Sequence, residues 1–361
     1  MIELLPRIFA YKLAYYTGFP KILPVSYTIS LTYRCNSRCS TCNVYKKKSE
    51  HMSLEEYRLL FKSLGKSPYW ITYSGGEPFL RENLVEIVTL GYKICKPAMI
   101  NIPTNGILVD KIVESVGKIS EACPKSQIII NLSIDGVGEQ HDKIRNVEGN
   151  YQKVIETYNR LREKNYKNVS IGIHSVISVF NVQDFTKISN TLMKLNPDQY
   201  ITEIAEERVE LDTIGQEITP SLLSYKAAID YLIHRIKNTK IKKRVNRITQ
   251  AFRIEYYQLV KETLKEKTQV IPCYAGVASA QISPDGEVWT CCVKAKPLGH
   301  LKDTNFNFKK IWFAELAKKE RASIKNKECY CPLANAAYTN MLHDIPTLYR
   351  VFIRSFVKWW T

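Results

Sequence analysis

The sequence lacks three features that would each suggest a simple class of protein. It has no apolar run long enough to cross a membrane as a helix, no secretory signal, and no internal repeat or low-complexity tract. These absences exclude a membrane-spanning helix and a repeat architecture. They also argue against a secreted protein held together by disulfides. A chain of 361 residues with 45% hydrophobic residues is instead expected to form one large domain plus a smaller one around a sizeable core.

Acidic residues are also scarce relative to basic ones. The chain has 35 Asp and Glu against 52 Lys and Arg, which gives a net charge of +17. Such a charge predicts attraction to an acidic surface, namely phospholipid headgroups, nucleic acid or an anionic substrate. Ten cysteines without a secretory signal predict a reducing compartment and metal binding. The expected location is the cytoplasm, either free or at the inner face of the membrane.

Three of these cysteines lie in one short loop directly after an apolar run. Cys35, Cys39 and Cys42 have the spacing C-x3-C-x2-C, and a fourth cysteine is missing. Structural zinc takes four protein ligands in a closed shell. Three thiolates fit instead a four-iron cluster that keeps one iron open for a substrate or cofactor. The alternatives are a zinc loop and a chance grouping of thiols.

This spacing resembles that of the radical S-adenosylmethionine (radical SAM) family, and the resemblance covers most of residues 25–335. It implies that the open iron binds SAM and that an electron from the cluster cleaves SAM to a 5′-deoxyadenosyl radical, which abstracts hydrogen from a substrate. It also implies an electron donor of the ferredoxin or flavodoxin type. Thr41 departs from the family pattern, which usually has an aromatic residue before the last cysteine.

Alternation of strand-like and helix-like segments predicts a parallel sheet with crossover helices. Ser53 and Glu56 form a capping box that predicts a helix to about Leu64. The resemblance implies an α/β fold, a partial (β/α)6 barrel with the site at the carboxyl ends of the strands. The expected strands are 25–32, 69–73, 98–103, 127–134, 169–179 and 200–204. The expected regions are an amphipathic extension (1–24), the barrel (25–215), a basic helical bridge (216–268), a small cluster domain (269–335) and an amphipathic helix (336–361).

Motifs at the ends of three predicted strands resemble the SAM-binding motifs of the family. The first is a GGEP turn, the second a TNG turn, and the third an S-x-D-G stretch followed by H-D-x-x-R. The resemblance implies that Ser133 and Arg145 bind the SAM carboxylate, since arginine grips carboxylates bidentately. The alternatives that involve no cofactor are ordinary turns at the ends of strands and a surface ion pair between Arg145 and Asp142. The residues expected to bind the cofactor are Ser74, Gly75, Gly76, Glu77, Pro78, Thr104, Asn105, Ser133, Asp135 and Arg145.

Two further polar residues fall on the predicted fifth and sixth strands. His174 is a candidate for contact with substrate, although a histidine in such a strand is more often a hydrogen-bonded core residue. Glu203 is a candidate substrate contact or proton acceptor. Cys95 and Cys123 have no partner at ligand spacing and are expected to be buried free thiols.

A second cysteine group lies near the C-terminus. It contains a Pro284-Asp285-Gly286 turn between two strand-like segments, which predicts a hairpin. The segment resembles the start of the SPASM domain of radical SAM enzymes. Because only five cysteines remain, the count favours the truncated Twitch form with one auxiliary 4Fe-4S cluster. The expected ligands are Cys273, Cys291, Cys329 and Cys331, with Cys292 as an alternative ligand and a four-cysteine zinc site as the alternative metal centre.

The two ends of the chain and the basic run 235–253 bear on the substrate. Residues 348–360 repeat aromatic and cationic residues at helical spacing, which is typical of a helix at a membrane interface but also of a helix packed on the barrel. The main hypothesis is therefore a radical SAM enzyme acting on a lipid or lipid-linked molecule. The alternative is a radical SAM enzyme that modifies peptides or proteins. A nucleic-acid-binding iron–sulfur protein is disfavoured, because the basic run has few aromatic residues for stacking.

Overall fold

The structure, a computed structural model, describes residues 5–48, 50–238 and 244–356. One nine-stranded sheet runs through the molecule in the order β6-β5-β4-β3-β2-β1-β7-β8-β9. Strands β1 to β6 pair in parallel, as the alternation predicted, and form the partial (β/α)6 barrel. Their bounds are β1 (Ser26–Thr32), β2 (Trp70–Gly75), β3 (Met99–Thr104), β4 (Gln127–Ser133), β5 (Val169–Ile177) and β6 (Gln199–Ile204).

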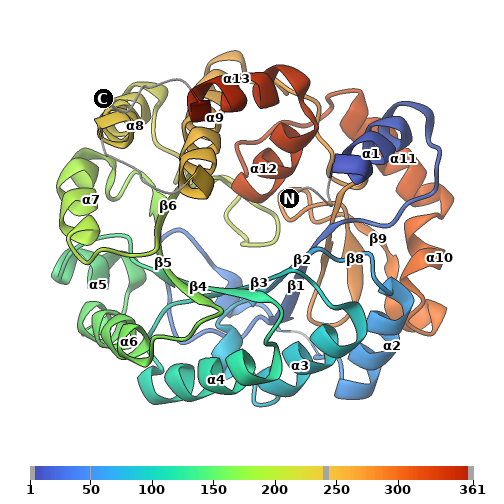
Figure 1. Ribbon diagram of the computed structural model, residues 1–361, viewed down its shortest axis with the longest axis horizontal. Helices are drawn as coiled ribbons and strands as arrows, with labels where there is room; N and C mark the ends of the chain where they lie inside the picture. The colour runs from blue at the N-terminus through green and yellow to red at the C-terminus, as the bar shows by residue number, and fades with distance from the viewer. Residues whose placement is uncertain (1–4, 49, 239–243, 357–361) are drawn as a thin grey trace.

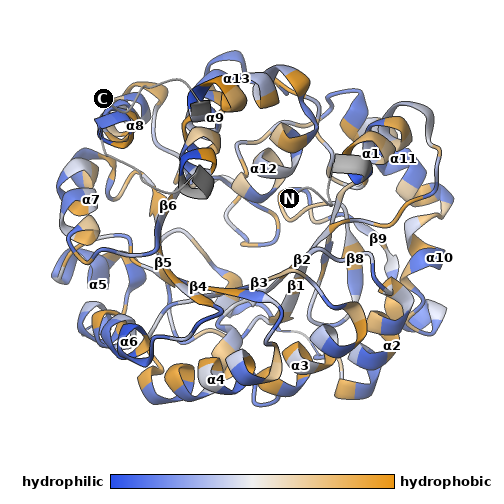
Figure 2. Ribbon diagram, in the orientation of Figure 1, coloured by the Kyte–Doolittle hydropathy of each residue, from blue (hydrophilic) through white to orange (hydrophobic). Residues whose placement is uncertain are grey.

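Crossover helices cover the outer face of the barrel strands, where they form an arc in Figure 1. Each turns apolar residues toward the sheet, so the core is a shared layer of isoleucine, leucine and tyrosine side chains (Figure 2). The predicted capping box is confirmed, because Ser53 and Glu56 bond each other's backbone amides at the start of α2. The helices are α2 (Leu54–Leu64), α3 (Leu84–Cys95), α4 (Val109–Ala122), α5 (Glu139–Arg145), α6 (Asn150–Lys164) and α7 (Phe185–Met193). Cys95 and Cys123 are buried thiols, as expected.

The segment with the second cysteine group does not stand apart from the barrel. Its first strand, β7, pairs in parallel with β1, so that Ser279 lies opposite Ser26. The predicted hairpin is present, since β7 and β8 pair antiparallel across the Pro-Asp-Gly turn. The strands and helices of this segment are β7 (Ser279–Ile282), β8 (Glu287–Trp289), β9 (Pro297–His300), α10 (Phe308–Trp312) and α11 (Glu315–Lys325).

Helix α1 and four helices that follow β6 in the chain close the side of the barrel between β6 and β9 (Figure 1). They are α1 (Leu5–Thr17), α8 (Leu222–Asn238), α9 (Arg244–Glu266), α12 (Ala334–His343) and α13 (Ile345–Phe356). Arg350 and Arg354 of α13 pair with the buried Glu255 of α9, at 2.6 and 2.5 Å. These cations of the predicted membrane face therefore bind within the protein. Residues 1–4, 239–243 and the aromatic end 357–361 lie outside the described residues.

Candidate functional site

The loop with Cys35, Cys39 and Cys42 follows the carboxyl end of β1 and is clamped by the end of α5. The amide of Ser40 donates to the carbonyl of Ile144 at 2.8 Å, and the amide of Arg38 donates to the carbonyl of Arg145 at 3.1 Å. These bonds join the cysteine loop to a helix more than one hundred residues away in sequence.

The sulfur atoms of this loop accept hydrogen bonds, as ligands of an iron–sulfur cluster do. The Ser37 amide lies 3.4 Å from Cys35 Sγ, and Arg145 Nη1 lies 3.6 Å from Cys39 Sγ. Burial raises the pKa of Cys35 to about 11 and that of Cys42 to about 12. Thiols in this setting become thiolates when a metal centre supplies the compensating positive charge. The donor set therefore fits a cluster.

The GGEP turn after β2 packs against the cysteine loop. A Cβ atom on Gly75 would collide with the Thr32 backbone, and one on Gly76 would collide with Arg34. Both glycines are thus required by the close approach of the two strand ends. This explains them without a ligand, although we expected them to make room for one.

Glu77 connects the GGEP turn to the TNG turn after β3. Its buried carboxylate accepts from the Thr104 hydroxyl at 2.9 Å, the Asn105 amide at 2.8 Å and the Phe79 amide at 3.1 Å. Burial raises the pKa of Glu77 to about 7, although these hydrogen bonds oppose the rise. Asn105 in turn donates from Nδ2 to Asn36 Oδ1 at 2.7 Å. The two turns and the cysteine loop therefore form one hydrogen-bonded unit, and the expected SAM contacts of its residues stay a prediction.

Arg145 does not form the surface pair with Asp142 that the spacing allowed. It pairs with Asp135 at 2.7 Å; the Asp135 side chain is buried, whereas the Arg145 side chain is 12% exposed. Asp142 instead accepts from the amides of Gly149 and Tyr151. The Nε atom of Arg145 has no hydrogen-bond partner among the described residues. Arg145 thus lies between the cysteine loop and Asp135 with a donor to spare, as its predicted role toward the SAM carboxylate requires.

His141 holds the same region in place from behind. Its Nδ1 accepts from the Asp135 amide at 3.1 Å, so its Nε2 donates to Asn150 Oδ1 at 2.5 Å. Burial, reinforced by Arg145, lowers the pKa of His141 to about 4. His141 is therefore protonated at a lower pH in the folded protein than in the unfolded chain, where its pKa is about 6.5.

His141 is expected to make stability pH-dependent. As pH falls from about 6.5 toward 4, its contribution should decline by roughly 1.4 kcal/mol per pH unit. Thermal unfolding of anaerobic protein at pH 7.0 and 5.5 measures this loss, which His141→Gln should reduce. The matched control is His234→Gln on the exposed side of α8. An equal loss in wild type and His141→Gln would contradict the prediction.

His174 and Glu203, chosen separately from the sequence, are brought together at the ends of β5 and β6. His174 Nε2 lies 3.0 Å from Glu203 Oε1, and Arg208 Nη2 lies 3.8 Å from the other oxygen. The strand register also places His174 opposite Ser133, which is half-buried at the end of β4. Burial alone would raise the pKa of Glu203, but His174 and Arg208 lower it to about 2. Glu203 is therefore poorly suited to accept a proton at neutral pH.

The sequence analysis missed Glu206 and Arg208, which lie beside this pair. Arg208 Nη2 lies 3.0 Å from Glu206 Oε1. Oε2 of Glu206 and Nε of Arg208 are buried and have no hydrogen-bond partner among the described residues. Burial raises the pKa of Glu206 to about 7, although Arg208 opposes the rise. The available signal was the charged run directly after β6, at the end of the barrel where sites form.

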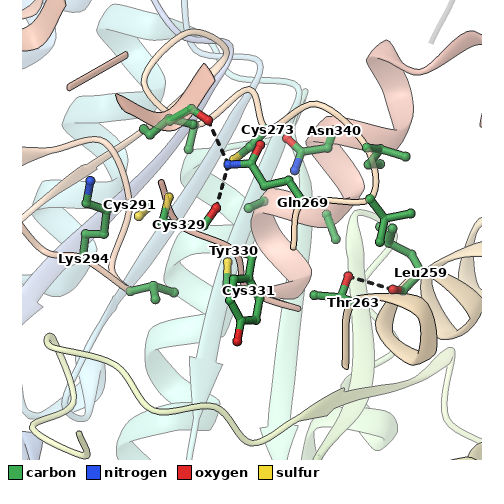
Figure 3. A pocket seen from close by; sticks show the side chains of 17 residues that line it. Leu259, Thr263, Gln269, Cys273, Cys291, Lys294, Cys329, Tyr330, Cys331 and Asn340 are labelled. Carbon is green, nitrogen blue, oxygen red and sulfur yellow. Dashed lines mark hydrogen bonds between the residues drawn. The ribbon is translucent and has the colours of Figure 1, made fainter. Parts of the chain in front are cut away.

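Four cysteines of the second group surround one cavity, shown in Figure 3. They are Cys273, Cys291, Cys329 and Cys331. Burial raises the pKa of the Cys291 thiol, and the backbone amides of Lys294 and Val293 oppose the rise. Four thiols around one cavity also fit a cluster. Cys292 is buried and packs against Leu333 and Ala336 instead of lining the cavity.

Comparison with known families matches two parts of the chain. Residues 29–192 match the radical SAM superfamily, and residues 273–332 match the SPASM iron–sulfur cluster-binding domain. The second match contains all five C-terminal cysteines. Both cysteine sets of the structure therefore coincide with the segments that these families use for clusters.

Curated relatives are more distant. The chain is 30% identical over 168 residues to Fe-coproporphyrin III synthase of Methanosarcina barkeri, covering 45% of this chain and 39% of the relative. It is 26% identical over 335 residues to the subtilosin biosynthesis protein AlbA of Bacillus subtilis, covering 86% and 66%. It is 25% identical over 300 residues to GTP 3′,8-cyclase of Aquifex aeolicus, covering 79% and 87%.

Solved structures share the fold at low identity. Streptococcus suis SuiB bound to S-adenosylmethionine superimposes with a TM-score of 0.62 at 13% identity, covering 83% of this chain and 68% of SuiB. The protein anSMEcpe with bound AdoMet gives a TM-score of 0.60 at 16% identity, covering 92% and 97%. The barrel and its C-terminal addition are thus shared as a fold.

Proposed function

The chain belongs to the radical SAM superfamily and carries a SPASM domain, and we propose that it modifies a peptide or protein held between its two cysteine sites. By these two family matches it is an enzyme that uses SAM and 4Fe-4S clusters. When bound, SAM and the cluster would supply the radical chemistry that removes a hydrogen atom from the substrate, while the protein would orient the partners and exclude water. An electron donor of the ferredoxin or flavodoxin type stays a prediction.

We assign the cofactors to the residues expected from the sequence. Cys35, Cys39 and Cys42 would hold the first cluster, and the four cysteines of the cavity would hold one auxiliary cluster. Cys292 is not assigned as a ligand, because it is not among the residues that line that cavity. The SAM contacts would come from Ser74, Gly75, Gly76, Glu77, Pro78, Thr104, Asn105, Ser133, Asp135 and Arg145.

The observation that carries the proposal is the path of residues 203–212. This segment bonds to the first cluster loop, since Asn43 donates to the carbonyls of Leu211 and Asp212, both at 2.9 Å. It also bonds to the SPASM segment, where the amide of Val209 donates to the Val293 carbonyl at 3.0 Å. The segment that carries Glu206 and Arg208 therefore contacts both the first cluster loop and the SPASM segment.

The chemistry of these two side chains suits a peptide. Each peptide unit offers one donor and one acceptor. Glu206 Oε2 is a buried acceptor without a partner among the described residues, and Arg208 Nε is a buried donor in the same state. Unpaired buried groups cost free energy unless a ligand satisfies them. Glu206, whose pKa is raised to about 7, is also suited to take a proton from the substrate.

Relatives support a peptide substrate over a nucleotide. AlbA is described by its role in biosynthesis of the bacteriocin subtilosin, and its similarity extends over 335 residues. SkfB of Bacillus subtilis, a maturation protein of the sporulation killing factor, is 29% identical over 147 residues. GTP 3′,8-cyclases match as well, so any test of the substrate must include GTP as a candidate.

A lipid or lipid-linked substrate at a membrane surface is the second candidate. Helix α1 exposes Phe9, Leu13 and Tyr16, which are 73%, 50% and 56% accessible, along one side. An aromatic stripe beside basic residues can lie in a lipid interface. Among the described residues, none of the helices combines the length and the apolar character needed to span a bilayer. The pairing of Arg350 and Arg354 with Glu255 weakens the lipid hypothesis, because these cations bind within the protein.

Transfer of deuterium into 5′-deoxyadenosine tests the proposal. Reduced enzyme with SAM is given three probes in parallel, namely a perdeuterated peptide and protein fraction of the organism carrying the gene, its perdeuterated lipid fraction, and deuterated GTP. We expect label from the peptide and protein fraction, and we expect its loss after protease treatment. Label from the lipid fraction or from GTP alone would overturn the proposal.

A further inference from the structure

A buried carboxylate lies between two lysines near the auxiliary cysteine cavity. Glu320 of α11 is 1% exposed, and its oxygens lie 2.5 Å from Lys294 Nζ and 3.1 Å from Lys296 Nζ. Two ammonium groups and one carboxylate leave one positive charge at this edge. Burying such charges is costly, and sequence analysis assigned them no role.

The two lysines differ in their relation to the cavity. Lys294 lines it, and Figure 3 shows its side chain beside Cys291 and Cys329. Its side chain is 24% exposed, whereas that of Lys296 is 56% exposed and is not among the cavity-lining residues. Lys294 interacts electrostatically with both of these cysteines, and Glu320 acts on Cys329 with the opposite sign. A charge that is partly shielded from water acts over a longer range than an exposed one.

We propose that Lys294 and Glu320 set the reduction potential of the auxiliary cluster, with Lys294 raising it and Glu320 lowering it. A reduced cluster carries one more negative charge than an oxidised one, so a nearby cation stabilises the reduced form and a nearby anion destabilises it. Charge and hydrogen bonding around the sulfurs are the means by which proteins tune such clusters. Glu320 also fixes the position of the flexible lysine chain, which makes Lys294 a positioned charge and not a mobile one.

The test is a redox titration of the cluster-loaded protein followed by electron paramagnetic resonance, in which the first cluster serves as an internal reference. Lys294→Gln should lower the reduction potential of the auxiliary cluster by about 59 mV. For a one-electron couple, this shift makes the ratio of reduced to oxidised cluster about tenfold lower at a given potential. Glu320→Gln should shift it upward. Lys296→Gln is the matched control, since it removes a cation from the same carboxylate but outside the cavity, and its shift should be smaller than that of Lys294→Gln.

Opposite signs distinguish tuning from structural damage. If the pair only held the fold together, both substitutions would loosen the site and shift the potential in the same direction. Equal directions, or an unchanged or lower potential in Glu320→Gln, would overturn the proposal. If Lys294→Gln fails to load iron, two other variants test the proposal. Glu320→Gln should still raise the potential, and Lys294→Arg, which keeps the positive charge, should keep the wild-type potential. The readout does not depend on the substrate, so a failure of the peptide proposal would leave this result unaffected.

Discussion

Alanine at Cys35, Cys39 and Cys42 together is expected to abolish the formation of 5′-deoxyadenosine from SAM. These are the thiols of the loop after β1, and their sulfurs already accept hydrogen bonds from Ser37 and Arg145. Without them no cluster is held beside the GGEP and TNG turns, so the electron needed for cleavage cannot reach SAM. Chromatography of anaerobic reactions with dithionite measures the product, which should fall below detection.

Iron content provides the second measurement for the same variant. Two four-iron clusters correspond to about eight irons per chain, and the triple variant should retain about four. Cys95→Ala with Cys123→Ala is the control, because these thiols lie in the core of the outer helices and should leave both iron and activity intact. Formation of 5′-deoxyadenosine by the triple variant would refute the assignment. Four irons plus one zinc in wild type would refute the auxiliary cluster.

Local patterns predicted the barrel well, because its elements are defined by short-range signals. Each of these signals depends on residues that are close in sequence. They are the alternating β-branched residues of the strands, the capping box at Ser53 and the turns after each strand. The motifs that mark the SAM site are also local, and the fold brings them together since parallel strands end at one edge. His174 and Glu203 were found for this reason, as both sit near the ends of adjacent strands.

Contacts between distant segments could not be predicted in the same way. Pairing of β7 with β1 joins residues more than two hundred positions apart, and no local pattern in β7 names its partner strand. Arg145 has an acidic residue at helical spacing, Asp142, but it pairs with Asp135 because the helix turns its end toward the cysteine loop. The arginines of α13 suggested a lipid-facing surface, whereas Glu255 on α9 takes them into the protein.

Glu206 is the residue whose role depends most on such distant contacts. Its position in a charged run gives no reason to prefer it over Glu207, the next residue in the chain. The structure separates them, since Glu206 is buried beside Arg208 whereas Glu207 caps the amides of Gly215 and Glu217 near the surface. Only Glu206 combines burial, a raised pKa and a free oxygen among the described residues.

Glu206→Gln is therefore expected to uncouple the two halves of the reaction. The substitution keeps the shape of the side chain but removes its capacity to take a proton, so conversion of the substrate should fall by roughly 10²-fold or more. Reductive cleavage of SAM should continue, because Glu206 is not part of the first cluster loop or of the predicted SAM contacts. The measured signature is 5′-deoxyadenosine formed without matching product, and Glu207→Gln is the control that should keep both.

The pH profile distinguishes proton transfer from a purely structural role of Glu206. A carboxyl group whose pKa is raised to about 7 carries its proton below that pH and can accept one only above it. Product formation by wild type should therefore rise with pH through about 7, while SAM cleavage should not follow the same curve. In Glu206→Gln the residual product formation should lose this rise. A variant that keeps the wild-type profile, or that loses SAM cleavage together with product, would show that Glu206 supports the site without taking the proton.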